Sequence, residues 1–285
     1  MSTTLSKPAR KPTRTAPRRS AVIWLSYGIL VAVAVVVLLA DVLAPHAPNQ
    51  QDLTSVLLGP SAEHPLGTDD LGRDVLSRLL HGTRVSILAA LLAVGIALVV
   101  GFPLGILAGY VGGWPDAVLM RLLDTVMAFP ALVLAIGITA MLGPDITTAM
   151  VAVGVVLTPV VVRLTRAQTM AVAGQTYIEA ASSFGARGVR RMILPHVVPN
   201  VVQPIVAQVA VLIGFALIAE ASLSFLQLGV QPPTASWGTI LARSYTFLER
   251  APMSIFVPGA AIALTVFALN IVGEEVQRLL DPRRR

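Results

Sequence analysis

Few residues in this chain of 285 have side chains suited to covalent or metal-assisted chemistry. It contains no cysteine, and its only lysines are Lys7 and Lys11. A P-loop needs a lysine directly after its glycines to reach the nucleotide phosphates, so the chain cannot itself carry that site. The metalloprotease pattern HExxH and the nucleophile-elbow pattern GxSxG are also absent from the sequence.

The four histidines, His46, His64, His81 and His196, stand at irregular spacings. Without cysteines there is no thiolate site either, so we expect no metal site and no cofactor. No acid and base residues form a convincing pair, so the sequence predicts no catalytic residues and argues against an enzyme.

The composition instead indicates a membrane protein. The chain is 55% hydrophobic and 13% charged, with a mean hydropathy of +0.78, whereas soluble domains carry about 25% charged residues. A helix needs about 20 apolar residues to cross a bilayer. Since no run alternates as membrane barrel strands do, we predict an all-α polytopic fold. The six expected spans are Ala21–Leu43, Val85–Gly109, Leu119–Met141, Thr147–Leu164, Val201–Ile218 and Ile255–Val272.

The distribution of basic residues predicts the topology. Sixteen of the 21 lysines and arginines fall on one side of these spans if both termini share that side, and five fall on the other. By the positive-inside rule, we expect a protein of the cell membrane with both termini on the cytoplasmic side. Because this bias already accounts for the basic charge, we expect no nucleic-acid partner.

Three regions follow from these patterns. Residues 1–20 are basic and rich in Pro, Ser and Thr, which predicts a disordered cytoplasmic tail. Residues 21–84 hold the first span and an extracytoplasmic segment, in which an amphipathic surface helix is expected from Asp74 onward. Residues 85–285 form the core with five spans and a cytoplasmic loop at about 165–200. The first span could also be a signal peptide, but its apolar run exceeds the usual length of about 7 to 15 residues.

Two features inside the spans have more than one interpretation. Gly101, Gly105 and Gly109 recur on one face of the second span, a pattern that favours close packing of two helices. Asp124 stands near the cytoplasmic end of the third span. A carboxylate there is a candidate functional group, but it could also reach water or Arg121.

The cytoplasmic loop contains the stretch YIEAASSFGARGVRR, which begins at Tyr177. Tyr177, Ala180, Ala181 and Phe184 fall at i, i+3, i+4 and i+7 and so share one face of a helix, with Glu179 beside it. That face is apolar and shallow, and it can dock in a groove of another protein. Gly185 stands where the periodicity stops, as expected of a left-handed residue after a helix. From these residues alone, an ordinary loop kept inside by its arginines is the alternative.

This stretch resembles the EAA loop of ABC importer permeases, whose pattern Glu179, Ala180, Ala181 and Gly185 match. Pro199 lies one residue further from Gly185 than the family pattern places its proline. Further segments resemble the C-type permease subunits of dipeptide, oligopeptide and nickel importers. They are HPLGTDDLGRDVLSRLLHGTRVSI, RLLDTVMAFPALVLAI, EASLSFLQLGVQPPTASWG and FALNIVGEEVQRLLDPR.

The resemblance implies the type I ABC importer fold, with six transmembrane helices. It also implies four partners besides the lipid bilayer: a homologous second permease, two ABC ATPase subunits and an extracytoplasmic substrate-binding protein. The helix from Tyr177 to Gly185 would be the coupling helix, which is seated in a groove of the ATPase. ATP hydrolysis on the partner subunits would drive import of peptides or a related solute such as nickel.

Asn200, Gln203 and Gln208 lie within about 140° of one another on the fifth expected helix, at about 100° per residue. They could line a translocation path or hydrogen-bond to neighbouring helices. The alternative function, a stand-alone secondary transporter or channel, would need ionisable residues inside the membrane. Asp124, Arg163 and Glu220 are the candidates near a span. A membrane enzyme is a third interpretation, and it lacks a catalytic constellation.

Overall fold

The computed structural model describes residues 17–185 and 188–280. Throughout these residues the regular elements are helices, as predicted. They are α1 (Pro17–Leu43), α2 (Val75–Val111), α3 (Gly113–Met127), α4 (Ala131–Leu142), α5 (Ile146–Ala173), α6 (Thr176–Ser183), the π-helix η1 (Val189–Val197), α7 (Val198–Phe225), α8 (Trp237–Ser244), the 3-10 turn η2 (Tyr245–Phe247) and α9 (Met253–Leu280).

Five helices in this part of the chain are long and apolar enough to cross a membrane. They are the segments Ala21–Leu43, Val75–Val111, Ile146–Ala173, Val189–Phe225 and Met253–Leu280. The third expected span, Leu119–Met141, is not one straight helix, because α3 and α4 meet at an angle of 87°. Pro130 precedes α4 at this break and cannot continue the hydrogen bonding of α3. A sixth span is complete only if this bent pair is counted as one.

The second span also begins earlier than expected. The amphipathic segment after Asp74 is not a separate surface helix but the first turns of α2, which runs through the expected boundary at residues 84 and 85. Asp74 caps this helix by accepting a hydrogen bond from the backbone of Ser77. The expected tail at residues 1–20 is partly wrong too, since α1 starts at Pro17. Residues 1–16 lie outside the described part of the chain.

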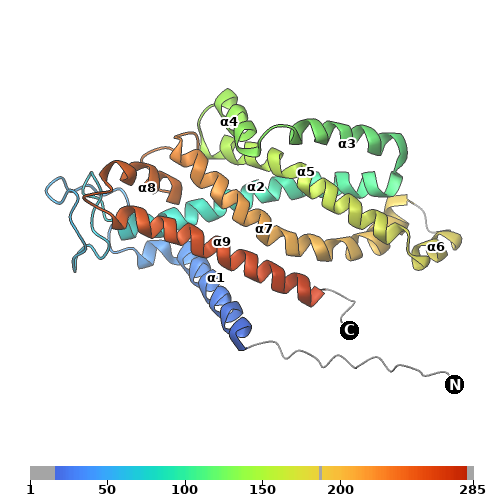
Figure 1. Cartoon of the computed structure of the whole chain (residues 1–285), viewed down its shortest axis with the longest axis horizontal. Coiled ribbons are helices and arrows are strands. Elements are labelled where there is room, and N and C mark those ends of the chain that lie inside the picture. The colour runs from blue at the N-terminus through green and yellow to red at the C-terminus, as the bar shows by residue number, and fades with distance from the viewer. Residues whose placement is uncertain (1–16, 186–187, 281–285) are drawn as a thin grey trace, which may run out of the picture.

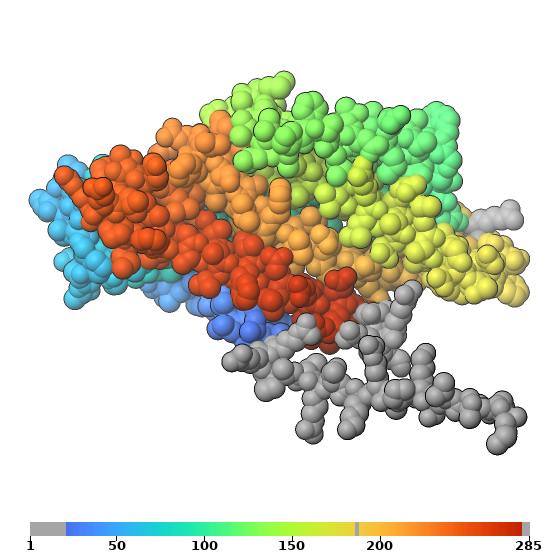
Figure 2. All heavy atoms as spheres, viewed as in Figure 1, coloured from blue at the N-terminus to red at the C-terminus, as the bar shows by residue number. Residues whose placement is uncertain are grey.

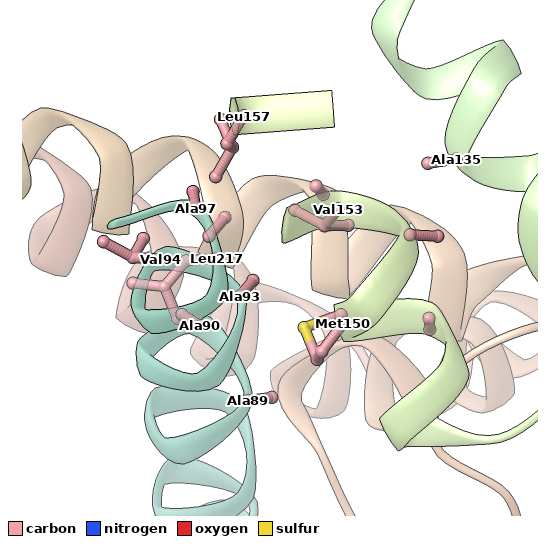
Figure 3. Close-up of a cluster of buried hydrophobic side chains, with 14 of the residues drawn as sticks. Ala89, Ala90, Ala93, Val94, Ala97, Ala135, Met150, Val153, Leu157 and Leu217 are labelled. Atoms are coloured by element: carbon pink, nitrogen blue, oxygen red, sulfur yellow. The ribbon is translucent and has the colours of Figure 1, made fainter. Parts of the chain in front are cut away.

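The helices pack in layers around α2, α5 and α7 (Figure 1). The bent pair α3 and α4 lies on one side of these helices, and α1 and α9 lie on the other. The core is built from small residues, with Ala90, Ala93 and Ala97 of α2 fully buried beside Met150 and Val153 of α5 (Figure 3). Small side chains let the helices approach closely, which is the main source of packing attraction within a bilayer.

The two ends of the bundle differ. Helix α6 forms part of one end, whereas α8 and the irregular segment 44–74 form the other (Figures 1 and 2). Helix α1 starts and α9 finishes on the side toward α6 (Figure 1). The structure therefore separates a short exposed helix from a polar, loop-rich end by the length of the long helices.

Candidate functional site

Helix α6 is short and has defined ends. Gln175, with an extended backbone, precedes it, and Glu179 lies in its first turn, where a carboxylate interacts favourably with the helix dipole. The helix stops at Ser183, and Gly185 has a φ of +87°. This confirms the expected left-handed residue at the end of the helix, a conformation that glycine adopts without strain.

The predicted docking face of α6 is largely exposed. Tyr177 is 45% exposed and Phe184 is 93% exposed, and Ala180 lies open between them. Ala181 is half-buried at the edge of this face. Tyr177, Ala180 and Phe184 are therefore exposed among the described residues, whereas Ala181 packs against a second hydrophobic cluster. Aromatic side chains are enriched among the residues that contribute most to protein–protein interfaces, so this face is a candidate contact surface.

Ile178 anchors the other side of α6. Its side chain is 5% exposed and packs in a second core, away from the main one. The buried members of that second core are Ile106, Ile178, Met192, Ile193, Val197, Val201 and Ile205. The sequence pattern did not indicate Ile178, although an isoleucine in a helix of mostly small residues was the available signal. Ile178 packs α6 against a cluster that also contains residues of α2, η1 and α7.

Three further hydrogen bonds involve α6, one to η1 and two within the helix. The hydroxyl of Tyr177 donates to the carbonyl of His196 at 3.4 Å. The carbonyl of Glu179 accepts from the hydroxyls of Ser182 and Ser183, each at 3.0 Å. The structure gives the Glu179 carboxylate no ion-pair partner within the residues it describes, and the side chain is exposed. A contact between this carboxylate and a partner protein stays a prediction.

The segment after α6 contains the additional residue noted in the sequence. Gly188, with a φ of +76°, precedes the π-helix η1, which includes Pro195 and leads directly into α7. A π-helix bonds residue i to i+5, so each turn holds more residues than an α turn. Pro199 lies two residues after the end of this π-helix, at the start of α7.

Asn200, Gln203 and Gln208 all lie in the first half of α7. The amide of Asn200 donates to the carbonyl of His196 at 2.8 Å, one turn earlier, so this side chain is engaged within its own segment. Gln203 is exposed and Gln208 is half-buried. The assignment of these amides to a translocation path stays a prediction.

Ion pairs join α3 to α5. Asp124 pairs with Arg163 rather than with Arg121, the partner considered from the sequence. One turn further, Arg166 makes two hydrogen bonds of 2.5 Å to the carboxylate of Asp116. Arg163 and Arg166 project from α5 toward α3, so they reach carboxylates that lie far away in the sequence. Asp124 and Arg163 are thereby neutralised by each other, which weakens the interpretation of either as an ion-coupling group.

At the opposite end a cavity of about 460 Å³ lies between segment 44–74 and α8. Its polar lining includes Asp70, Arg73, Arg78 and Arg243. Arg243 makes two hydrogen bonds to Asp70, at 2.5 and 2.9 Å, and these raise the pKa of its guanidinium. Asp69 holds Arg73 at 2.6 Å and Arg78 at 3.5 Å. These ion pairs connect segment 44–74 to α2 and α8.

A helical bundle with several helices long and apolar enough to span a membrane, an exposed short helix at one end and a polar network at the other is the architecture of a multi-pass membrane protein. The profile of the family described as "Binding-protein-dependent transport system inner membrane component" matches residues 101–285. The chain therefore belongs to this family and is a transport permease.

Curated relatives cover almost the whole chain. A di/tripeptide transport system permease protein of Pseudomonas aeruginosa (strain UCBPP-PA14) is 38% identical over 292 residues, covering 97% of this chain and 96% of the relative. A dipeptide transport system permease protein of Alkalihalophilus pseudofirmus is 36% identical, covering 90% and 84%. A glutathione transport system permease protein of Pectobacterium atrosepticum is 40% identical, covering 86% and 81%.

Proposed function

We propose that the chain is one of two homologous, non-identical permease subunits of an ABC importer, with α6 as the coupling helix. The observation that carries this proposal is the division of α6 into two sides. Ile178 is buried in the second core, while Tyr177, Ala180 and Phe184 face outward. A helix that is fixed to the bundle on one side and exposes a shallow aromatic face on the other can transmit motion from a docked partner.

The partner that fits this face is an ATPase subunit. The chain lacks the lysine of a P-loop, so ATP hydrolysis that drives import would take place on another protein. Two ABC ATPases on the cytoplasmic side would drive the two permeases between inward- and outward-facing states. Glu179, Ala181 and Gly185 complete the contact, since Glu179 borders the exposed face and Gly185 turns the chain away from it.

The proposed topology puts α6 and both termini in the cytoplasm. Six spans result when α3 and α4 are counted as one. The excess of lysines and arginines on the α6 side supports this orientation by the positive-inside rule. The segment 44–74 and α8 would then face the extracytoplasmic binding protein, in a cell or inner membrane.

The proposed substrates are short peptides. The relatives described above carry names for dipeptides, di/tripeptides and glutathione, all of which contain peptide bonds. Asn200, Gln203 and Gln208 would contribute amide groups to the path between the two permeases. Unchanged uptake rate and selectivity in a Gln203→Leu variant would remove Gln203 from that path.

The experiment compares Phe184→Ala with Trp24→Ala in the complete complex reconstituted in liposomes. Both residues are exposed aromatics, but Trp24 lies on α1, far from α6 in the chain. Truncating an aromatic anchor of an interface costs about 2 kcal/mol or more. Phe184→Ala should therefore lower peptide uptake per ATP hydrolysed by about tenfold, and Trp24→Ala should leave it unchanged. Equal coupling ratios in the two variants would refute the role of α6.

A further inference from the structure

Two histidines that are distant in the sequence lie together beside the start of α2. The rings of His46 and His64 have centroids 4.9 Å apart. One nitrogen of each ring and one carboxylate oxygen of Asp74 all lie within 4.8 Å of one another. His64 and Asp74 are buried, and His46 is half-buried. The irregular loop between α1 and α2 creates this arrangement, which is why sequence spacing did not indicate it.

His64 and Asp74 are held in place by other contacts. Nδ1 of His64 lies 3.1 Å from Oδ1 of Asp74. The other carboxylate oxygen, Oδ2, accepts from the backbone N–H of Ser77 at 2.7 Å and from its hydroxyl at 2.6 Å. The backbone N–H of His64 donates to Ser61 at 3.0 Å. These bonds orient the two ligand atoms before any ion arrives.

No comparable contact holds the side chain of His46 within the described residues. Its Nδ1 is buried and finds no hydrogen-bond partner among residues 17–185 and 188–280. Only its backbone is fixed, by an N–H bond to the hydroxyl of Ser77 at 3.1 Å. A buried polar atom without a partner loses its hydration and gains nothing in return. In this position, beside a second imidazole and a carboxylate, a metal ion would satisfy it.

We propose that His46, His64 and Asp74 bind a transition-metal dication of the Zn²⁺ type. Two imidazole nitrogens and one carboxylate oxygen are a typical ligand set for such ions, whereas Mg²⁺ and Ca²⁺ prefer oxygen alone. Two ligands of a tetrahedral ion, each about 2.0 Å from it, stand about 3.3 Å apart. The 3.1 Å between His64 and Asp74 is close to that separation. Water would take the fourth position.

The metal would fasten segment 44–74 to the start of α2. The same segment carries Asp69 and Asp70, which hold Arg73, Arg78 and Arg243 at the polar cavity. A bound ion would therefore stabilise the network at that end of the bundle. This inference does not rest on the peptide-importer proposal, and its failure would leave that proposal intact.

The test uses the full chain in lipid nanodiscs, purified with an affinity tag that contains no histidine. Zn²⁺ is titrated in competition with a chromophoric chelator, and Co²⁺ is used as a spectroscopic probe. The deciding variant is His46→Gln, because Nδ1 of His46 has no hydrogen-bond partner within the described part of the chain and the backbone N–H is retained. His81→Gln is the matched control. That histidine lies on α2, where its ring nitrogens contact Asp41 and the Ser77 carbonyl.

The wild-type chain should bind one Zn²⁺ at micromolar or lower concentration, and Co²⁺ should give the visible bands of a four-coordinate site that Zn²⁺ removes. Loss of an outer partner of a metal site already weakens binding by about 10- to 100-fold. His46→Gln should therefore weaken binding at least tenfold, and His81→Gln should not change it. Absence of stoichiometric binding by the wild type, or wild-type affinity in His46→Gln, would overturn the proposal.

Discussion

Gly105 of α2 lies directly against Thr165 of α5. A Cβ added to Gly105 would come within 2.5 Å of the Cβ of Thr165 and 2.7 Å of the carbonyl oxygen of Val162. Gly101 faces Val161 and Gly109 faces Thr169 in the same way, one turn in either direction. The three glycines expected to permit close helix packing therefore do so, and they join α2 to α5 along the half of the bundle that leads to α6.

Gly105→Ala should destabilise the protein, because the contact includes backbone that cannot move aside. Overpacking a tight interface costs about 1 to 3 kcal/mol. Gly95 is the matched control, since it lies on the same helix with nothing within 4 Å of an added Cβ. Alanine is favoured over glycine within a helix by up to about 1 kcal/mol. The thermal unfolding midpoint in one detergent should fall for Gly105→Ala and not for Gly95→Ala. Equal midpoints would contradict the packing account.

Trp237 should be the most sensitive position of α8. It is 1% exposed, its indole N–H donates to Thr83 at 3.1 Å, and its backbone N–H donates to Ser86 at 3.1 Å. Trp237→Ala should cost about 3 to 5 kcal/mol, because it leaves a large cavity. Trp237→Phe keeps most of the packing and should cost about 1 kcal/mol for the lost hydrogen bond. Thermal unfolding midpoints in detergent measure the stability of both variants. Similar decreases in the two midpoints would show that side-chain packing is not the main contribution of Trp237 to stability.

The ion pair of Asp70 and Arg243 connects segment 44–74 to α8 and can be tested by exchange. Either single change, Asp70→Arg or Arg243→Asp, places like charges together and should increase proteolysis of segment 44–74. The double variant restores opposite charges and should regain part of the protection. If the double variant is cleaved faster than both single variants, the pair does not hold this segment.

Much of the fold followed from apolar runs of about 20 residues, because helices in a bilayer must satisfy their own backbone. The position of Gly185 was predictable for a similar reason, since few residues other than glycine adopt a positive φ. The bend at Pro130 was harder to predict, because a proline within a membrane helix can also be accommodated by its neighbours. The amphipathic segment after Asp74 forms the first turns of α2 because the Asp74 side chain caps the helix at that point. This cap, rather than the apolar run, fixes where the helix starts.

Contacts between segments that are far apart in the chain could not be predicted from the sequence. Arg163 reaches Asp124 only because α5 packs beside α3, and sequence distance favoured Arg121 instead. His46 meets His64 and Asp74 through a loop without periodicity. Ile178 was missed because the pattern of α6 drew attention to its exposed face. In each case the determining factor was tertiary packing, which a single sequence does not encode in its local spacing.

The chain has no cysteine, so single cysteines can report its topology without background. Ala62→Cys lies in the exposed part of segment 44–74, and Phe184→Cys lies on α6. In intact cells a membrane-impermeant maleimide should label Ala62→Cys and leave Phe184→Cys unlabelled, with the reverse in inside-out vesicles. Labelling of both positions from one side would contradict the proposed orientation.

The contact between α6 and an ATPase is tested most directly by cross-linking from Phe184→Cys. The complete complex is assembled in inside-out vesicles and treated with a short bifunctional reagent that joins the cysteine to a neighbouring amine. Trp24→Cys serves as the exposed control on α1. The account predicts a covalent adduct between Phe184→Cys and an ATPase subunit, with a yield that changes when ATP is added, and none from Trp24→Cys. A complex that assembles and imports peptide but gives no ATPase adduct from Phe184→Cys would contradict it.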